Sequence, residues 1–85
     1  MEIKVLGPGC PKCKKLYEQT GQALQELGLA ATLTKGDQIT EIMAYHVLAT
    51  PALVINGTVK AAGRLPSAAE LANWLTTAAA EEQAR

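Results

Sequence analysis

The sequence predicts an α/β protein with one four-stranded mixed sheet, and three observations support this fold class. Strand-like and helix-like segments follow one another along the 85 residues in the order β-α-β-α-β-β-α. The β-α-β beginning implies parallel strands joined by a right-handed crossover. Between the last two strand-like segments, Asn56-Gly57 is typical of a tight hairpin turn, so we expect these two strands to be antiparallel.

Length and composition indicate a single globular domain that spans residues 1–85. Hydrophobic residues make up 48% of the chain, but only one Trp and two Tyr are aromatic, so aliphatic side chains must build the core. Eight basic residues balance eight acidic ones, which argues against binding to nucleic acid or to a membrane surface. No apolar run approaches the roughly 20 residues of a membrane span, and the N-terminus lacks the apolar core of a signal peptide.

The first strand and the first helix have clear boundaries in the sequence. Residues 2–6 have the pattern of a short buried strand, and the helix is expected over residues 11–27. Pro11 suits the first turn of that helix, and Gly28 is a typical stop signal at its C-terminal end. One apolar stripe is expected to face the core, formed by Leu16, Thr20, Ala23, Leu24 and Leu27.

The middle of the chain predicts a second strand over residues 30–35, followed by a second helix with Asp37 as its N-cap. The apolar face of this helix is expected to consist of Ile39, Ile42, Met43, His46 and Val47. Because His46 falls on that face, we expect a partly buried histidine with a structural role and no catalytic one.

The last third of the chain predicts a hairpin and a helix. The strands cover residues 52–55 and 58–62. The third helix opens near Pro66, where Ser67 and Glu70 have the spacing of a capping box. The tail, residues 81–85, is expected to fray.

The chemistry of the chain is expected where Cys10 and Cys13, its only cysteines, stand between the first strand and the first helix. The unpaired N–H groups and the positive dipole end at a helix N-terminus favour the thiolate form of a cysteine. Cys10 would occupy the cap, and Cys13 would follow one turn later on the same face. A disulfide that closes so short a loop gains little chain entropy, so redox cycling is a better explanation for the pair than stabilisation.

Three lysines crowd the beginning of the first helix, and they have two interpretations. Lys12, Lys14 and Lys15 stand at the positive end of the helix dipole, which is unfavourable for helix stability. They are either a solvated basic rim, or a local positive field that favours the thiolate and attracts acidic partners.

Two segments give the chain a family resemblance: Gly9-Cys10-Pro11-Lys12-Cys13, and the run from Thr50-Pro51 to Asn56-Gly57. With these motifs the chain resembles the thioredoxin fold, and most closely the small archaeal and bacterial thioredoxin- or glutaredoxin-like group called redox-active disulfide proteins. The resemblance covers essentially the whole chain. It implies a three-layer α/β/α architecture with sheet order 4-3-1-2 and the third strand antiparallel to the others. Helices one and three would cover one face, and helix two the other.

The resemblance also implies a thiol–disulfide oxidoreductase that reduces disulfides of partner proteins. Cys10 would be the exposed attacking thiol and Cys13 the buried resolving thiol, with Gly9, Pro11 and Lys12 as their immediate surroundings. The Cys10–Cys13 disulfide would be the only redox group, with no bound cofactor and no metal. The partners would be protein disulfides and an upstream reductase of the thioredoxin-reductase type. From the lack of a membrane span and of a signal-peptide pattern we expect a cytoplasmic location, and we expect a monomer.

A second part of the implied site lies far away in the sequence. Pro51 would form a cis peptide bond beside the cysteines, and Thr50 would offer its backbone to a bound substrate strand. The alternative is an ordinary trans-proline at the beginning of a strand.

The sequence departs from the family pattern at positions that matter for mechanism. Lys4 stands six residues before Cys10, where larger thioredoxins have a buried Asp, so the proton acceptor for Cys13 is not identified. Gly9 replaces the family's Trp. Glutaredoxins hold glutathione with an Asp that residues 61–67 do not contain, which makes glutathione binding doubtful, although Arg64 could meet a carboxylate.

The main alternative function is a soft-metal-binding or metal-carrier module that uses the same Cys10 and Cys13. Copper chaperone domains also place a C-x-x-C pair before their first helix, but after a Gly-Met-Thr triplet, and their chain ends in a strand. Here the preceding triplet is Gly7-Pro8-Gly9, and the chain ends in a helix. Two thiolates alone make only half of a zinc site. A redox-inert interaction domain is a third class, and the cysteine pair argues against it.

Overall fold

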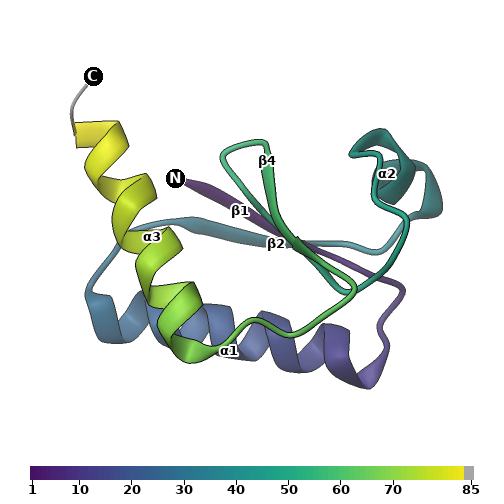
Figure 1. The fold of residues 1–85 in the computed structure, drawn as a ribbon, viewed down its shortest axis with the longest axis horizontal. Helices are drawn as coiled ribbons and strands as arrows, with labels where there is room; N and C mark the ends of the chain where they lie inside the picture. Colours follow the sequence, from purple (N-terminus) through teal and green to yellow (C-terminus); the bar gives the residue numbers. More distant parts are fainter. Residues whose placement is uncertain (84–85) are drawn as a thin grey trace.

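The computed structural model describes residues 1–83 and has the predicted order of elements. Figure 1 shows four strands and three helices arranged around one sheet. Their bounds are β1 (Glu2–Leu6), α1 (Pro11–Leu27), β2 (Thr32–Gly36), α2 (Ile39–Ala44), β3 (Ala52–Ile55), β4 (Thr58–Ala62) and α3 (Ala68–Gln83).

The four strands form one mixed sheet in the order β2-β1-β3-β4, which confirms the expected topology. β1 runs parallel to β2, and β3 is antiparallel to both β1 and β4. The pairing of β3 with β4 changes register between Leu53 and Val54, because Lys60 is an extra residue in β4. This β-bulge lies on an outer strand of the sheet.

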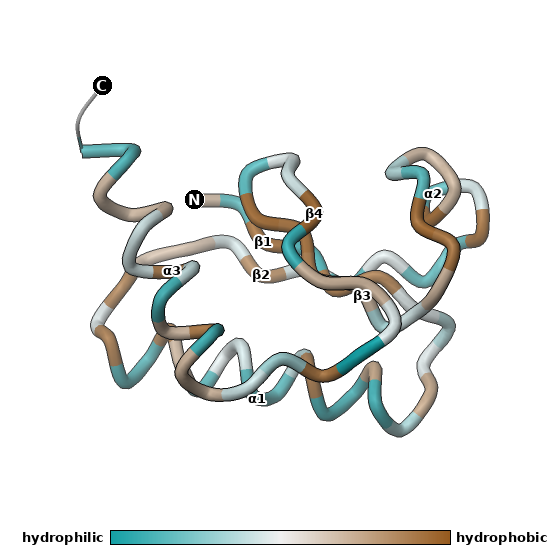
Figure 2. Tube along the Cα trace, in the orientation of Figure 1, coloured by the Kyte–Doolittle hydropathy of each residue, from teal (hydrophilic) through white to brown (hydrophobic). Residues whose placement is uncertain are grey.

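The sheet separates two apolar clusters, as the three-layer prediction requires. Figure 1 shows α1 and α3 together on one side of the sheet and α2 apart from them on the other. Alternate residues of β1 point to opposite faces: Ile3 and Val5 join the larger cluster, whereas Leu6 joins the smaller one. Figure 2 shows the hydrophobic residues concentrated in the central strands, while α1 alternates between hydrophobic and hydrophilic positions. The helices contribute Leu16, Leu24, Leu71 and Leu75 to the larger cluster, and Ile42 to the smaller.

Both ends of α1 follow the sequence signals. Pro11 occupies the first turn, and Gly28 caps the helix in the left-handed conformation with φ 66°. Along the predicted stripe, Thr20 is buried and bonds through its hydroxyl to the Leu16 carbonyl at 2.7 Å, whereas Leu27 is 40% exposed. The core-facing stripe therefore ends one turn before the helix does.

The middle of the chain differs from the prediction. β2 begins at Thr32, since its pairing with β1 starts where Thr32 lies opposite Glu2. α2 begins later than expected, with Gln38 at its N-cap, so the assignment of Asp37 as the cap was wrong. The helix ends at Ala44, before the expected apolar face is complete.

His46 is the clearest correction. It lies outside α2, is exposed, and has a positive φ of 58°. The expectation of a partly buried histidine on the helix face was therefore wrong. Ile39 and Met43 are also largely exposed, at 71% and 66%, because the short helix turns only part of its apolar face toward the sheet.

The last helix begins as predicted. Ser67 and Glu70 form the capping box, with the Glu70 N–H donating to the Ser67 hydroxyl and the Ser67 N–H donating to the Glu70 carboxylate, each at 3.1 Å. α3 then continues through Gln83, beyond the point where fraying was expected, and the last two residues of that tail lie outside the described residues. Among the described residues, no helix is long and apolar enough to cross a membrane.

Candidate active site

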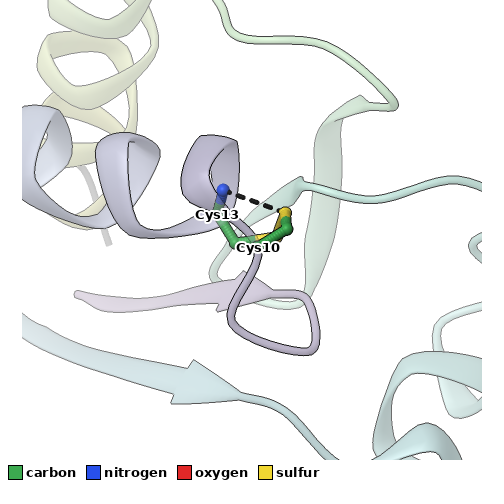
Figure 3. The surroundings of a disulfide bond; sticks show 2 residues. All are labelled: Cys10 and Cys13. Carbon is green, nitrogen blue, oxygen red and sulfur yellow. Dashed lines mark hydrogen bonds between the residues drawn. A yellow bond between two sulfur atoms is a disulfide. The ribbon is translucent and has the colours of Figure 1, made fainter.

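The two cysteines lie at the start of α1, just after the turn that connects β1 to this helix. Cys10 is the N-cap of α1, and its sulfur accepts a hydrogen bond from the Cys13 N–H at 3.2 Å. The two sulfurs form a disulfide, with the Cα atoms 5.0 Å apart. Figure 3 shows this arrangement, in which the first turn of the helix holds both sulfurs at its N-terminal end. A free helix N–H group is therefore directed at the Cys10 sulfur, which stabilises negative charge on it.

The two sulfurs differ in their access to solvent. Cys10 is half-buried, whereas Cys13 is only 5% exposed and packs under the turn that precedes the helix. A partner molecule can therefore approach the Cys10 sulfur much more easily than the Cys13 sulfur.

Gly7 is a site residue that the sequence analysis did not single out. It is buried, and its N–H donates to the Gly36 carbonyl at 3.0 Å, which continues the pairing of β1 with β2. A Cβ atom on Gly7 would overlap the Cys13 sulfur. Gly7 is therefore needed for close approach of the backbone to the sulfur. In the sequence it looked like an ordinary turn glycine, because its contact with Cys13 depends on where the helix folds back.

The Thr50–Pro51 segment lies beside the cysteines, although about forty residues separate them in the sequence. The Thr50–Pro51 peptide bond is cis, and Pro51 is buried. Gly7 adjoins both Cys13 and Thr50. A Cβ atom placed on Gly7 would overlap the Cys13 sulfur and would lie 3.7 Å from the Thr50 Cβ. The Pro51 carbonyl accepts a hydrogen bond from the Gly63 N–H at 2.9 Å, which ties the segment to the end of β4.

The remaining predicted site residues surround Cys10. Gly9 adopts φ 93°, a conformation that favours glycine, and Pro11 and Lys12 are exposed. Lys14 and Lys15 are exposed as well, and within residues 1–83 none of these three lysines makes an ion pair. The structure therefore brings all seven predicted site residues to one end of the sheet.

Comparison with known proteins agrees with this geometry. Residues 1–76 match the family described as the thioredoxin domain. The chain is 36% identical over 69 residues to the thioredoxin of Methanocaldococcus jannaschii, a match that covers 81% of this chain and 79% of the relative. It is 32% identical over 76 residues to the thioredoxin of Methanothermobacter thermautotrophicus, covering 89% of this chain and 99% of that protein.

The chain belongs to the thioredoxin family. The family, together with the Cys10–Cys13 disulfide at a helix N-terminus, identifies it as a thiol–disulfide oxidoreductase in the broad sense.

Lys4, which replaces the Asp of larger thioredoxins, is turned away from the cysteines. Its ammonium binds the Glu41 carboxylate at 2.6 Å on the α2 side of the sheet, with the Tyr45 ring 5.8 Å away. The hydrogen bond from Lys4 to Glu41 raises the pKa of Lys4, against the smaller opposing effect of burial. Lys4 therefore stays charged at neutral pH and cannot accept the proton of Cys13.

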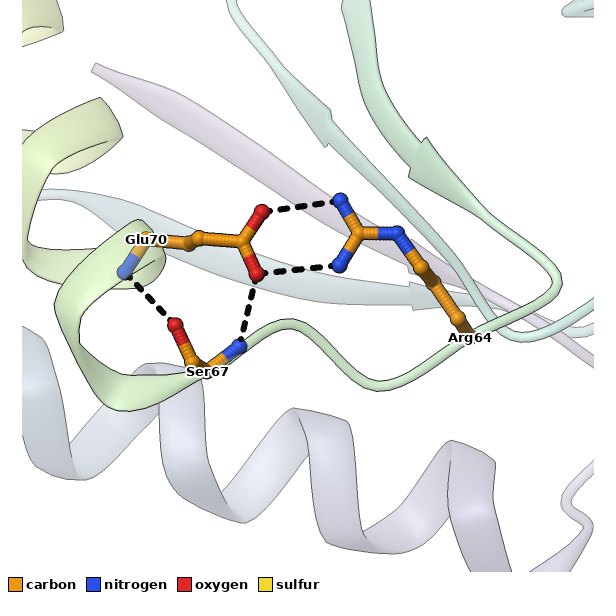
Figure 4. A network of polar contacts seen from close by, with 3 residues as sticks. All are labelled: Arg64, Ser67 and Glu70. Carbon is orange, nitrogen blue, oxygen red and sulfur yellow. Dashed lines mark hydrogen bonds and ion pairs between the residues drawn. The ribbon is translucent and has the colours of Figure 1, made fainter.

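Arg64, the one residue that seemed able to hold a glutathione carboxylate, already has a carboxylate partner. Its guanidinium binds both oxygens of Glu70, at 3.0 and 2.9 Å. Figure 4 shows the two groups facing each other, with Ser67 on the far side of the carboxylate. The hydrogen bond from Arg64, followed by that from the Ser67 N–H, lowers the pKa of Glu70 to about 2. The pair caps α3, so the Arg64 guanidinium is already engaged with a carboxylate of the chain itself.

A small cavity of about 140 Å³ opens behind Cys13. Its wall includes Gly7, Lys14, Lys35 and Asp37, which come from the turn before α1, from α1 itself, and from β2 and the turn after it. Nothing in the sequence indicated this cavity, because it depends on the register between β1 and β2. Within residues 1–83, no group of three Cys, His, Asp or Glu side chains is placed to hold a metal ion.

Proposed function

We propose that this protein reduces disulfide bonds of other proteins by a dithiol–disulfide cycle of Cys10 and Cys13. The observation that carries the proposal is the asymmetry of the pair. One half-buried sulfur caps a helix and receives an N–H group, while the other is enclosed directly beneath it. Such a pair supports attack by one thiol and release of the product by the other.

The cycle balances without any further redox group. The Cys10 thiolate attacks one sulfur of the partner disulfide, which forms a mixed disulfide and leaves the other partner sulfur as a thiolate. The Cys13 thiolate then attacks the Cys10 sulfur, the bond from Cys10 to the partner breaks, and the electron pair leaves on the partner sulfur. The partner is reduced by two electrons, and Cys10–Cys13 is oxidised.

The surroundings of the pair suggest how the substrate is held and how the cycle continues. Thr50 and Pro51, beside Gly7, would receive an extended stretch of the partner next to its disulfide. An upstream reductase of the thioredoxin-reductase type would restore the dithiol. No bound cofactor is required, and the proposal places the protein in the cytoplasm, where such a dithiol is kept reduced.

Two serine variants test the proposal with insulin as the disulfide substrate and dithiothreitol as the reductant. Cys10→Ser should abolish turnover, because the approachable sulfur is gone. Reduced beforehand and mixed with insulin without dithiothreitol, Cys13→Ser should accumulate a covalent complex between Cys10 and an insulin chain, which mass spectrometry detects and added dithiothreitol cleaves. A Thr58→Ser variant, distant on β4, is the matched control and should turn over insulin like the unaltered protein.

The metal-carrier alternative predicts other results. In that case the wild-type protein would not accelerate insulin reduction, and the reduced protein would bind one equivalent of Cu(I) through both thiols. Equilibration of the protein in glutathione buffers with a chelator present would then show no single two-electron transition.

A further inference from the structure

The resolving thiol has a charged environment of its own. Cys13 is only 5% exposed, but it lines the cavity of about 140 Å³ behind it. The cavity has room for water, and Lys14, Lys35 and Asp37 give it polar groups, so a proton that leaves Cys13 has a path to solvent. The charged groups that line this cavity act on the Cys13 thiolate that remains.

Lys35 is directed into this region by strand pairing. In the parallel pair of β1 and β2, Lys35 lies opposite Val5. Paired residues share a face of the sheet, and Val5 packs into the cluster beneath α1, so the Lys35 side chain also extends toward α1. Lys35 and Cys13 both line the cavity.

An aromatic ring holds the charge of Lys35 in place. Its ammonium lies 4.6 Å from the centre of the Tyr17 ring, a distance at which a cation is attracted to the ring face. Tyr17 follows Cys13 by one turn of α1, so the two residues lie on the same face of the helix. Lys35 as a residue is exposed, and the contact with the Tyr17 ring restricts the movement of its ammonium beside the cavity.

Two other charged side chains line the cavity beside Cys13. Lys14 of α1 also lines the cavity and adds a second positive charge, while Asp37, in the turn after β2, opposes them with one negative charge. Lys4 of β1 lies on the other face of the sheet and is neutralised by Glu41. The balance at the cavity is therefore positive by one charge, and a positive charge favours a thiolate over a thiol.

We propose that Lys35, held over Tyr17, is a positioning residue for the second half of the cycle, where it stabilises the Cys13 thiolate that attacks the mixed disulfide. The inference rests on the proposed disulfide exchange. In that step the Cys13 proton passes to cavity water, the Cys13–Cys10 bond forms, and the partner sulfur leaves with the electron pair. Lys35 touches neither the partner nor the sulfur that is attacked.

Stopped-flow reaction with one equivalent of 4,4′-dithiodipyridine separates the two steps, because this neutral disulfide releases one chromophore at each. The first release reports the attack by Cys10, and the second reports resolution by Cys13. In Lys35→Gln the first phase should be nearly unchanged. The second should slow by about threefold at neutral pH: a tenfold smaller thiolate fraction is partly offset by greater nucleophilicity, with a Brønsted coefficient of about 0.4–0.5.

The pH dependence distinguishes an electrostatic role from a structural one. The rate of the second phase of Lys35→Gln should rise with pH. It should equal or exceed the wild-type rate once Cys13 is fully ionised in both proteins. Lys35→Arg should keep the wild-type profile, and Tyr17→Leu should shift it in the same direction as Lys35→Gln. Lys60→Gln, an exposed lysine of β4, is the matched control and should change neither phase.

A second phase that is unchanged in Lys35→Gln, or slowed by one factor at every pH, would overturn the inference. If the wild-type protein released only one equivalent of chromophore, Cys13 would not resolve the mixed disulfide, and the proposed disulfide exchange itself would be wrong.

Discussion

At Gly7, one absent side-chain atom decides whether the resolving sulfur fits. Since a Cβ atom here would overlap the Cys13 sulfur, Gly7→Ala should destabilise the protein by about 1–3 kcal/mol, the usual cost of overpacking. Gly21→Ala is a matched control, because its new Cβ would lie 3.5 Å from the Leu33 side chain, an ordinary contact. That variant should gain about 0.5–1 kcal/mol in helix propensity. Urea unfolding measures the stability of both variants. If the unfolding free energy changed in the same direction in both, the prediction would be wrong.

The lysines near Cys10 should affect stability and reactivity in opposite directions. Replacing Lys12 and Lys15 by Gln removes unpaired positive charge from the N-terminus of α1, so each change should stabilise the helix by about 0.3 kcal/mol. The same change weakens the positive field at Cys10, and its alkylation by neutral iodoacetamide at pH 7 should slow. Lys14 is kept, because it borders the cavity behind Cys13. If alkylation is as fast as before, the lysines are only a solvated rim.

Among the elements, α2 shows the limit of apolar periodicity. The spacing of Ile39, Ile42 and Met43 indicated a helix and one apolar face, but it did not indicate how far the helix runs. The helix ends because His46 adopts a left-handed conformation. At helix ends this conformation is usually adopted by Gly, and sometimes by Asn, so a His at this position gives no clear stop signal in the sequence. For α1 the stop was visible, because Gly28 supplies it.

This conformation of His46 gives a prediction for the end of α2. At φ 58°, glycine is free of the steric cost that any residue with a Cβ atom bears. His46→Gly should therefore be more stable than His46→Ala by about 1 kcal/mol in urea unfolding. The comparison with Ala keeps the loss of the imidazole the same in both variants. If Ala is the more stable of the two, this segment does not keep its left-handed conformation in solution.

The cap of α3 makes a specific contribution to acid stability. The pKa of Glu70 is about 2, below its ordinary value of 4.5, because Arg64 and then the Ser67 N–H bind its carboxylate. A lowered pKa in the folded state means that the contribution is complete above about pH 4.5 and disappears as the pH falls toward 2. The difference in urea midpoint between wild type and Glu70→Gln should therefore shrink over this range. Thr58→Ser, which removes no ionisable group, is the control, and its difference should stay nearly constant.

Over the whole molecule, local patterns and long-range placement differ in how much they predict. The element order and the cysteine pair at a helix cap follow from neighbouring residues, so the sequence was sufficient for them. The sheet order and the meeting of Thr50-Pro51 with the cysteines came from a family resemblance, because no local pattern specifies which strands pair. Gly7 and Lys35 were missed, since their roles depend on where β1 and β2 set the sulfur and the ammonium.

The smallness of the disulfide loop predicts similar folds for the oxidised and reduced protein. Cys10 and Cys13 are separated by three positions, so closing the loop removes little disorder from the unfolded chain. Reduction should cost at most about 2 kcal/mol of unfolding free energy by the chain-entropy estimate, and the far-UV circular dichroism should not change. Urea unfolding with and without dithiothreitol measures this. A reduced protein that melts to a partly unfolded state would show that the bond is structural.

We expect the bulge in β4 to protect the protein from aggregation in concentrated solution. An outer strand offers a row of unpaired N–H and C=O groups, on which the strand of a neighbouring molecule can grow and begin a fibril. In β4 this row is interrupted by the extra residue Lys60, which is exposed and charged. A second chain that tried to extend the sheet would meet a bend and a repelling ammonium group at the same point. Aggregation through this edge therefore lacks a regular template, although the strand itself keeps its pairing with β3.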